Sequence, residues 1–153
     1  MRTVLRVPQL QRLHLDHGPA VLAFERENRV YFSASISDRG DAYFAEFDVR
    51  HRALLAEQDA GLCHFHVLVD SGGAVVGRIN LVDVADGSAE LGYRIAERAA
   101  GRGLATVAVR QVCALAGTAY GLTTLRAGTN ADNLGSQAVL TRTKFRLVEE
   151  GRA

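Results

Sequence analysis

The sequence contains no tryptophan, and only two of its 153 residues are cysteine and two are proline. We interpret Cys63 and Cys113 as small apolar core residues, which is where free cysteine usually lies. No apolar run approaches the length of a membrane span, and residues 1–15 lack the sustained apolar stretch of a secretory signal. We therefore expect a cytoplasmic protein without a disulfide or a membrane partner.

An excess of charge of either sign is also lacking, because 18 basic and 17 acidic residues give a net charge of +1. No basic tract and no interleaving of basic and aromatic residues is present, which argues against nucleic acid as a partner. His64 and His66 share one face of a predicted strand, but the sequence offers no third ligand, so we expect no metal. The length predicts a single domain over residues 1–153.

The most informative segment is residues 98–106, Arg-Ala-Ala-Gly-Arg-Gly-Leu-Ala-Thr. It lies between a predicted strand (residues 89–96) and a predicted helix (residues 103–116). Unpaired N–H groups and the helix dipole make such a helix N-terminus an anion site that suits phosphate. Gly101 and Gly103 have no Cβ, so the backbone can approach a ligand closely.

Two common phosphate motifs are excluded here. The P-loop pattern is absent, and Thr106 stands where the dinucleotide pattern requires its third glycine. What remains is Arg-x-x-Gly-x-Gly, in which Arg98 and Arg102 offer guanidinium groups to phosphate oxygens. This spacing resembles the pyrophosphate loop of the GNAT N-acetyltransferase superfamily, with the pattern Gln/Arg-x-x-Gly-x-Gly/Ala.

Two further segments carry the same resemblance. Residues 130–136, Asn-Ala-Asp-Asn-Leu-Gly-Ser, are similar to the Asn-x-x-Asn-x-x-Ser segment that lies beside the pantetheine arm in GNAT proteins. The pair Asn28 and Arg29, after the first predicted helix, resembles the branch that acetylates ribosomal-protein N-termini (the RimJ/RimL type). The resemblance extends in register from about residue 10 to residue 145.

The resemblance implies acetyl-CoA as co-substrate and no metal. It implies acceptor-binding roles for Asn28 and Arg29, although these residues have the alternative role of holding the first loop. The implied cofactor-binding residues are Ile95, Ala96, Arg98, Gly101, Arg102, Gly103, Leu104, Ala105, Thr106 and Asn133.

The pattern predicts an α/β fold, α+β in some schemes, in which a mixed, mostly antiparallel central sheet is flanked by helices. In GNAT folds the strand before the motif helix and the strand after it diverge, and the acyl chain lies in the opening. The expected strands are residues 10–15, 63–70, 74–84, 89–96, 123–129 and 145–149, and the expected helices are residues 20–27, 41–58, 103–116 and 136–142.

The end of the chain departs from the family pattern. GNAT proteins usually have one more strand after residues 145–149, and Lys144 replaces the glycine that usually precedes Phe145. A strand without its partner leaves unpaired N–H and C=O groups at a sheet edge. We therefore expect this end either to be mobile or to be covered by a second subunit, and we slightly favour a homodimer. A truncated sequence is the alternative explanation for the missing strand.

Glu90 is the first candidate for the general base, because many GNAT proteins place a carboxylate on this strand. A surface glutamate is the equal alternative, and water is another candidate base. Glu27 is a weaker candidate, and Tyr93 is better interpreted as a core residue. Ser136 is the hydroxyl available to the leaving sulfur, or it caps the last helix.

The resemblance implies direct transfer of an acetyl group from acetyl-CoA to an amine within a ternary complex. The RimJ/RimL-like features imply a protein or peptide N-terminus as the favoured acceptor. An α-amine with a pKa near 8 also tolerates a weak base. Two alternatives stay open. One is a small-molecule acetyltransferase for an antibiotic or polyamine, and the other is a non-catalytic acyl-CoA-binding regulatory module.

Overall fold

A central five-stranded sheet organises the chain in the computed structural model, which describes residues 7–128, 134–143 and 145. The strands follow one another in space in the same order as in the sequence. They are β1 (Gln9–Arg12), β2 (His64–Val69), β3 (Val75–Ala85), β4 (Ser88–Ile95) and β5 (Thr124–Ala127).

The first four strands pair in an antiparallel manner, and β4 pairs with β5 in parallel. The short turn between β2 and β3 and the turn between β3 and β4 explain the antiparallel pairs. A parallel neighbour needs a crossover, which helix α5 (Leu104–Thr118) supplies. This arrangement confirms the predicted mixed, mostly antiparallel sheet.

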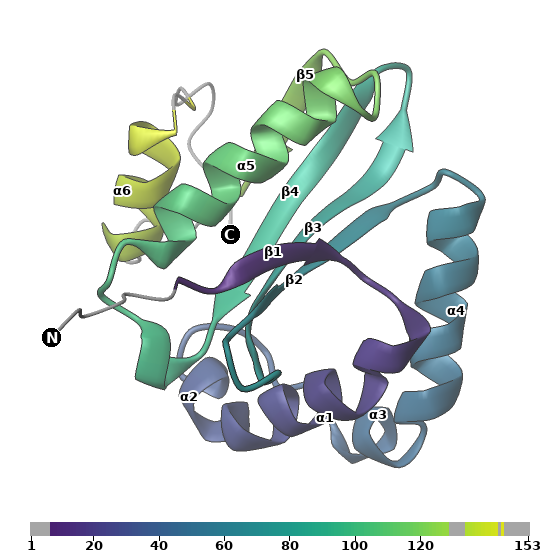
Figure 1. Cartoon of the computed structure of the whole chain (residues 1–153), viewed down its shortest axis with the longest axis vertical. Coiled ribbons are helices and arrows are strands. Elements are labelled where there is room, and N and C mark those ends of the chain that lie inside the picture. Colours follow the sequence, from purple (N-terminus) through teal and green to yellow (C-terminus); the bar gives the residue numbers. More distant parts are fainter. Residues whose placement is uncertain (1–6, 129–133, 144, 146–153) are drawn as a thin grey trace, which may run out of the picture.

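Helices flank the sheet in two groups (Figure 1). The helices α1 to α4 lie together, and α5 lies beside α6. Besides α5, the helical elements are η1 (Leu15–His17), α1 (Gly18–Glu27), α2 (Arg29–Ser33), α3 (Asp41–Ala45), α4 (Phe47–Asp59), η2 (Glu97–Ala99) and α6 (Leu134–Arg142).

Strand alternation divides the core between the two faces of the sheet. Val67 of β2 and its partner Arg78 of β3 point toward α1, where Val21 and Phe24 are buried. The neighbouring residues His66 and Ile79 therefore point toward α5, whose Val109 and Val112 are fully buried. Burying each such apolar side chain contributes roughly 1.5–3 kcal/mol.

The structure corrects two predicted elements. The first strand ends at Arg12, because His14 and His17 form a capping box around η1 instead of continuing the strand. Asp16 lies inside η1, and His17 precedes α1 without a side-chain cap. The predicted helix at residues 41–58 is two helices, α3 and α4, which meet at Glu46.

The predicted final strand, residues 145–149, lies outside the described residues apart from Phe145. The homodimer inferred from that strand stays a prediction. Among the described residues, no helix combines the length and the apolar character needed to cross a membrane.

Candidate active site

The phosphate motif forms a glycine turn at the N-terminus of α5. After η2, Gly101 and Gly103 both have φ of 75°, in the left-handed region that favours glycine. A Cβ built on either residue meets nothing within 4 Å. The turn therefore has open space on the side where side chains would stand. We call residues 98–106 the cofactor loop.

The backbone of the cofactor loop presents hydrogen-bond donors. Gly103 precedes α5 without a side-chain cap, and the first helical bond returns from the Val107 N–H to the Gly103 carbonyl at 3.2 Å. By helix geometry, the N–H groups of Leu104, Ala105 and Thr106 precede that first bond and are donors for an anion. Backbone donors and open glycine positions together fit a pyrophosphate.

The two motif arginines differ in their surroundings. The Arg98 guanidinium lies 3.5 Å from the Asp70 carboxylate, which follows β2, and about half of the Arg98 side chain is exposed. Arg102 is exposed on the turn. Because exposed ion pairs contribute little, Arg98 can exchange Asp70 for a ligand phosphate at small cost.

The edge of β4 opens next to the cofactor loop. Its pairing with β5 ends at Leu91 and Ala127, whereas its pairing with β3 continues to Ile95. The Ala96 N–H donates to the Val76 carbonyl at 2.8 Å, so antiparallel alternation turns the N–H and C=O groups of Tyr93 and Ile95 away from β3. The backbone groups of Ile95, a predicted cofactor residue, thus point toward the opening. Ala96 was also predicted to bind the cofactor, but its N–H is hydrogen-bonded within the sheet.

A pair of hydroxyl groups lies on the α5 side of this opening. The Tyr93 hydroxyl donates to Oγ of Ser136 at 3.2 Å, and both side chains are partly buried. Ser136 lies inside α6, which begins at Leu134, so it does not occupy the capping position. Asn133, a predicted cofactor residue, lies outside the described residues.

Polar groups lie on the other face of the same strand. Glu90 and Gly92 are exposed there, and a Cβ on Gly92 would meet nothing within 4 Å. Asn80 is the cross-strand partner of Gly92, and its Oδ1 is buried without a partner among the described residues. A buried, unpaired oxygen is costly, so Asn80 offers an acceptor to a group that binds over Gly92.

Asn28, predicted to bind the acceptor or to hold a loop, has a structural role. Its Nδ2 donates to the Phe24 carbonyl at 2.9 Å, and its Oδ1 accepts from the Glu97 N–H at 3.0 Å. The side chain is buried and ties the end of α1 to η2, directly before the cofactor loop. These bonds support the second of the two predicted roles.

Arg29 also holds local structure. Its guanidinium donates to both carboxylate oxygens of Asp38, at 3.0 and 2.8 Å, and to Asp41 at 2.8 Å. These hydrogen bonds hold the pKa of Asp38 at about 2. The hydrogen bonds of Arg29 therefore hold the segment between α2 and the start of α3.

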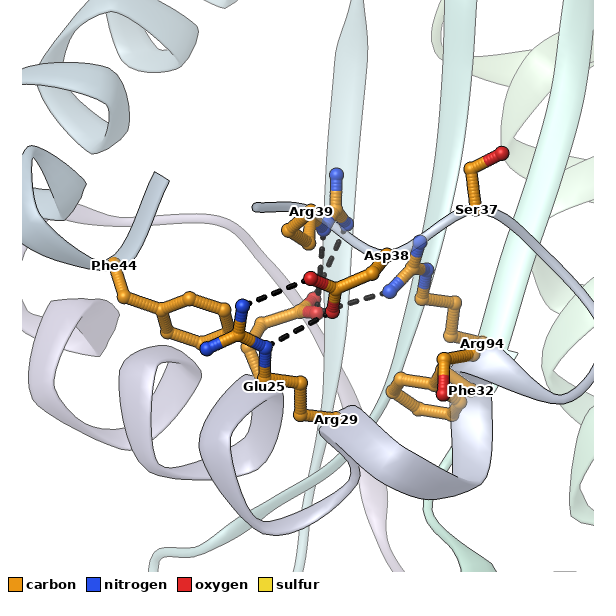
Figure 2. A pocket seen from close by; sticks show the side chains of 9 residues that line it. Glu25, Arg29, Phe32, Ser37, Asp38, Arg39, Phe44 and Arg94 are labelled. Atoms are coloured by element: carbon orange, nitrogen blue, oxygen red, sulfur yellow. Dashed lines mark hydrogen bonds and ion pairs between the residues drawn. The ribbon is translucent and has the colours of Figure 1, made fainter. Parts of the chain in front are cut away.

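Three arginines surround one buried carboxylate beside this segment, and Figure 2 shows two of them, Arg39 and Arg94, next to Glu25. Glu25 of α1 is 1% exposed and accepts from Arg78 at 2.9 Å, from Arg94 at 3.0 Å and from Arg39 at 3.2 and 3.3 Å. We call these four residues the arginine cluster. Three permanent positive charges and one negative charge leave two positive charges without a counter-charge within it.

The charges of the cluster shift one another. Burial alone raises the pKa of Glu25, but Arg78, followed by Arg39 and Arg94, lowers it below the ordinary value. Burial, followed by the neighbouring Arg39, lowers the pKa of Arg94. Glu25 is therefore held ionised, while the guanidinium groups repel one another.

His64 and His66, which share one face of β2, contact the side chain of Tyr120. The His66 Nδ1 lies 3.2 Å from the Ile79 carbonyl, so this nitrogen carries the proton and Nε2 accepts from the Tyr120 hydroxyl at 2.6 Å. Burial lowers the pKa of His66 to about 4. His64 stacks on the Tyr120 ring, with centroids 3.7 Å apart. Among the described residues no group of three or more histidine, cysteine, aspartate or glutamate side chains is arranged to hold a metal.

Sequence reasoning missed the arginine cluster and Asn80. One signal was available, because Glu25 follows Phe24 on the apolar face of α1, and Arg78 interrupts an apolar strand. Ionised side chains at such positions require partners. The identity of those partners depended on strand register, which the sequence did not give.

Comparisons with known proteins agree with this geometry. A family model described as an acetyltransferase (GNAT) domain matches residues 9–146. No curated protein matches the chain. Among solved structures, a ribosomal-protein-S5-alanine acetyltransferase from Vibrio fischeri is 18% identical with a TM-score of 0.87, and the match covers 94% of this chain and 82% of that one.

Two further structures differ in what they bind. RimJ from Mycobacterium smegmatis, in complex with CoA-disulfide, is 25% identical with a TM-score of 0.77, over 95% of this chain and 74% of that one. Spermidine N-acetyltransferase from Vibrio cholerae, in complex with CoA and spermine, is 18% identical with a TM-score of 0.73, over 94% and 82%. The fold is thus shared by proteins named for protein and for polyamine acceptors.

Proposed function

The chain belongs to the GNAT acetyltransferase family, and we propose that it transfers the acetyl group of acetyl-CoA directly to the α-amine of a peptide or protein. One observation carries this proposal. The open glycine turn at the N-terminus of α5 follows the part of β4 that, among the described residues, has no strand partner on the β5 side, so a pyrophosphate at the turn would place an extended pantetheine arm along β4.

The groups on the two faces of β4 suit the two halves of the reaction. The amine nitrogen attacks the thioester carbonyl from the side of Glu90 and Asn80, where Glu90 or water takes its proton. As the C–N bond forms and the C–S bond breaks, Ser136 donates a hydrogen bond to the leaving sulfur. Tyr93 orients Ser136 through the 3.2 Å contact. The amine's proton ends on the thiolate, so the products are an amide and CoA.

The candidate general base, Glu90, is an exposed carboxylate and therefore a weak base, which favours an α-amine as acceptor. An α-amine has a pKa near 8, whereas a lysine amine near 10.4 requires a stronger base. Glu90 is an exposed carboxylate, which suits an amine that is already partly neutral. A polyamine acceptor, the second candidate, would be favoured by a surrounding of carboxylates, but the other ionised residue of β4 on the face of Glu90 is Arg94.

The test is release of thiol from acetyl-CoA with four acceptors: a peptide with a free N-terminus, the same peptide blocked at its N-terminus, spermidine and an aminoglycoside. We expect turnover with the free peptide and none with the blocked one. Turnover with spermidine or the aminoglycoside alone would contradict the proposed acceptor. Binding of CoA without turnover of any amine would favour the regulatory module.

A variant tests the role of Glu90. Glu90→Gln should lower kcat by about 10²–10⁴-fold, the usual loss on removing a general base, with acetyl-CoA binding retained. Glu46→Gln, on the surface between α3 and α4, is the control and should keep wild-type turnover. Wild-type turnover of Glu90→Gln from pH 6 to 9 would assign the base to water.

A further inference from the structure

A row of polar groups leads from Glu90 to the arginine cluster on one face of the sheet. The cross-strand pairs on this face are Val82 with Glu90, Asn80 with Gly92, and Arg78 with Arg94. The row therefore has a carboxylate at one end, an unpaired amide oxygen in the middle and a surplus of guanidinium charge at the other end.

This arrangement is complementary to a molecule that carries an amine and a carboxylate some distance apart. We propose, on the basis of the function proposed above, that the acceptor is a peptide with an acidic side chain a few residues after its N-terminal amine. The amine binds near Glu90, the peptide passes over Gly92 and Asn80, and the acidic side chain binds at Arg94 and Arg39.

The distance between Glu90 and Arg94 determines the position of the acidic residue in the acceptor peptide. Glu90 and Arg94 are four strand residues apart, or roughly 13 Å between their Cα atoms. An extended peptide advances about 3.3–3.6 Å per residue, and a glutamate side chain adds a few ångströms. A glutamate at the third or fourth position of the acceptor therefore reaches the cluster while the amine lies near Glu90.

The mouth of the arginine cluster is accessible to such a side chain. Arg39 is 31% exposed and Arg94 is 18% exposed, whereas Glu25 and Arg78 lie behind them. The cavity here is lined also by Ser33 and Ser37, of which Figure 2 labels Ser37. Its volume is about 10 Å³, so it holds about one water. A carboxylate thus contacts the guanidinium groups at the mouth without entering.

Charge supports the same acceptor. Arg94 uses Nη1 for Glu25, and a guanidinium has five N–H donors, so it can bond a second carboxylate. That second carboxylate also reduces the repulsion among the three arginines. A polyamine bound along the same row would bring further positive charge against them.

The test uses the wild-type protein and three peptides with free N-termini, which differ only in glutamate, glutamine or lysine at the third position. With saturating acetyl-CoA, we expect kcat/KM for the glutamate peptide to exceed that for the glutamine peptide by about tenfold, and the lysine peptide to be poorest. The preference should weaken with added salt. Spermidine should be a poorer acceptor than the glutamate peptide.

Matched variants assign the preference to the cluster. Arg94→Gln should reduce the ratio between the glutamate and glutamine peptides toward one, whereas Arg26→Gln, on the exposed side of α1, should keep it. Equal kcat/KM for the three wild-type reactions, or spermidine as the best acceptor, would overturn this inference. Turnover without a charge preference overturns only the inference that the acceptor is acidic and leaves the proposed function intact. Absence of turnover with every amine overturns the proposed function as well.

Discussion

The cofactor loop and the arginine cluster meet at the same end of β4, but they are built from different parts of the chain. The loop is a continuous run of nine residues, and its donors are backbone N–H groups held by two left-handed glycines. The cluster takes one side chain each from α1, β3, β4 and the segment before α3. Backbone conformation therefore makes one half of the site, and tertiary packing makes the other.

This difference implies that the two halves respond differently to mutation. Changes in the loop should alter ligand binding with little effect on folding, because its donors face solvent. Changes in the cluster should alter folding, because its charges lose their partners inside the protein.

The largest expected effect is that of Glu25→Gln. This change leaves three guanidinium groups around a neutral amide, and breaking a buried ion pair in this way costs about 3–5 kcal/mol of unfolding free energy. Urea denaturation measures it. Glu27→Gln, two residues along α1 and exposed, is the control and should stay within about 0.5 kcal/mol. A loss below about 1 kcal/mol for Glu25→Gln would remove the contrast between the two halves.

The two faces of the sheet should also lose stability in different pH ranges. His66, on the α5 face, has its pKa lowered to about 4 from 6.5. Between pH 6.5 and 4, His66 is protonated in the unfolded chain but stays neutral in the folded protein. The free energy of unfolding therefore falls by about 3 kcal/mol over this range. Glu25, on the α1 face, has a lowered pKa, so its contribution is present above its unfolded pKa of about 4.5 and is lost as pH falls through its folded pKa.

Unfolding free energies at pH 7, 5.5 and 4.5 separate these two contributions. His66→Gln should flatten the decline between pH 6.5 and 4.5, whereas Glu25→Gln should leave that part of the profile unchanged because the Glu25 contribution is lost only at lower pH. A wild-type protein with equal stability at pH 7 and 4.5 would contradict a neutral, buried His66.

A smaller effect is expected in the cofactor loop. Gly103→Ala forces a side chain into a left-handed conformation and into the space offered to the ligand, so CoA binding should weaken about tenfold, or about 1.4 kcal/mol. Gly61→Ala introduces the same strain at φ of 77° after α4 and should leave CoA binding unchanged. Calorimetry with CoA measures both, and equal affinities would refute the placement of the pyrophosphate.

The smallest effect is expected for Tyr93→Phe, which removes a single hydrogen bond to Ser136. A bond of this kind is worth about 1 kcal/mol, so kcat should fall several-fold with KM for acetyl-CoA unchanged. Ser136→Ala should lower kcat at least as much. An unchanged kcat for both variants would show that the leaving sulfur receives its proton from water.

The sequence allowed prediction of features that depend on neighbouring residues. The glycine turn, the position of the α5 helix and the mixed, mostly antiparallel sheet were predicted, because turn residues and periodicity act over a few positions. The cluster was not predictable in this way, since Glu25 and Arg94 are 69 residues apart and meet only in the folded register. Asn80 was missed for the same reason. The break at Glu46 was missed because helical residues continue on both sides of it.

The ionic bonds of the segment between α2 and α3 have a practical consequence for protein engineering. Two salt bridges lie within residues 29–41, because Arg29 pairs with both Asp38 and Asp41. Arg39 forms the described ion pair that links this segment to Glu25. We expect that the segment can be exchanged as a cassette with that of another family member if Asn28 and Glu25 are kept. Such chimeras would vary acceptor choice while the bond from Asn28 to Glu97 keeps the cofactor loop in place.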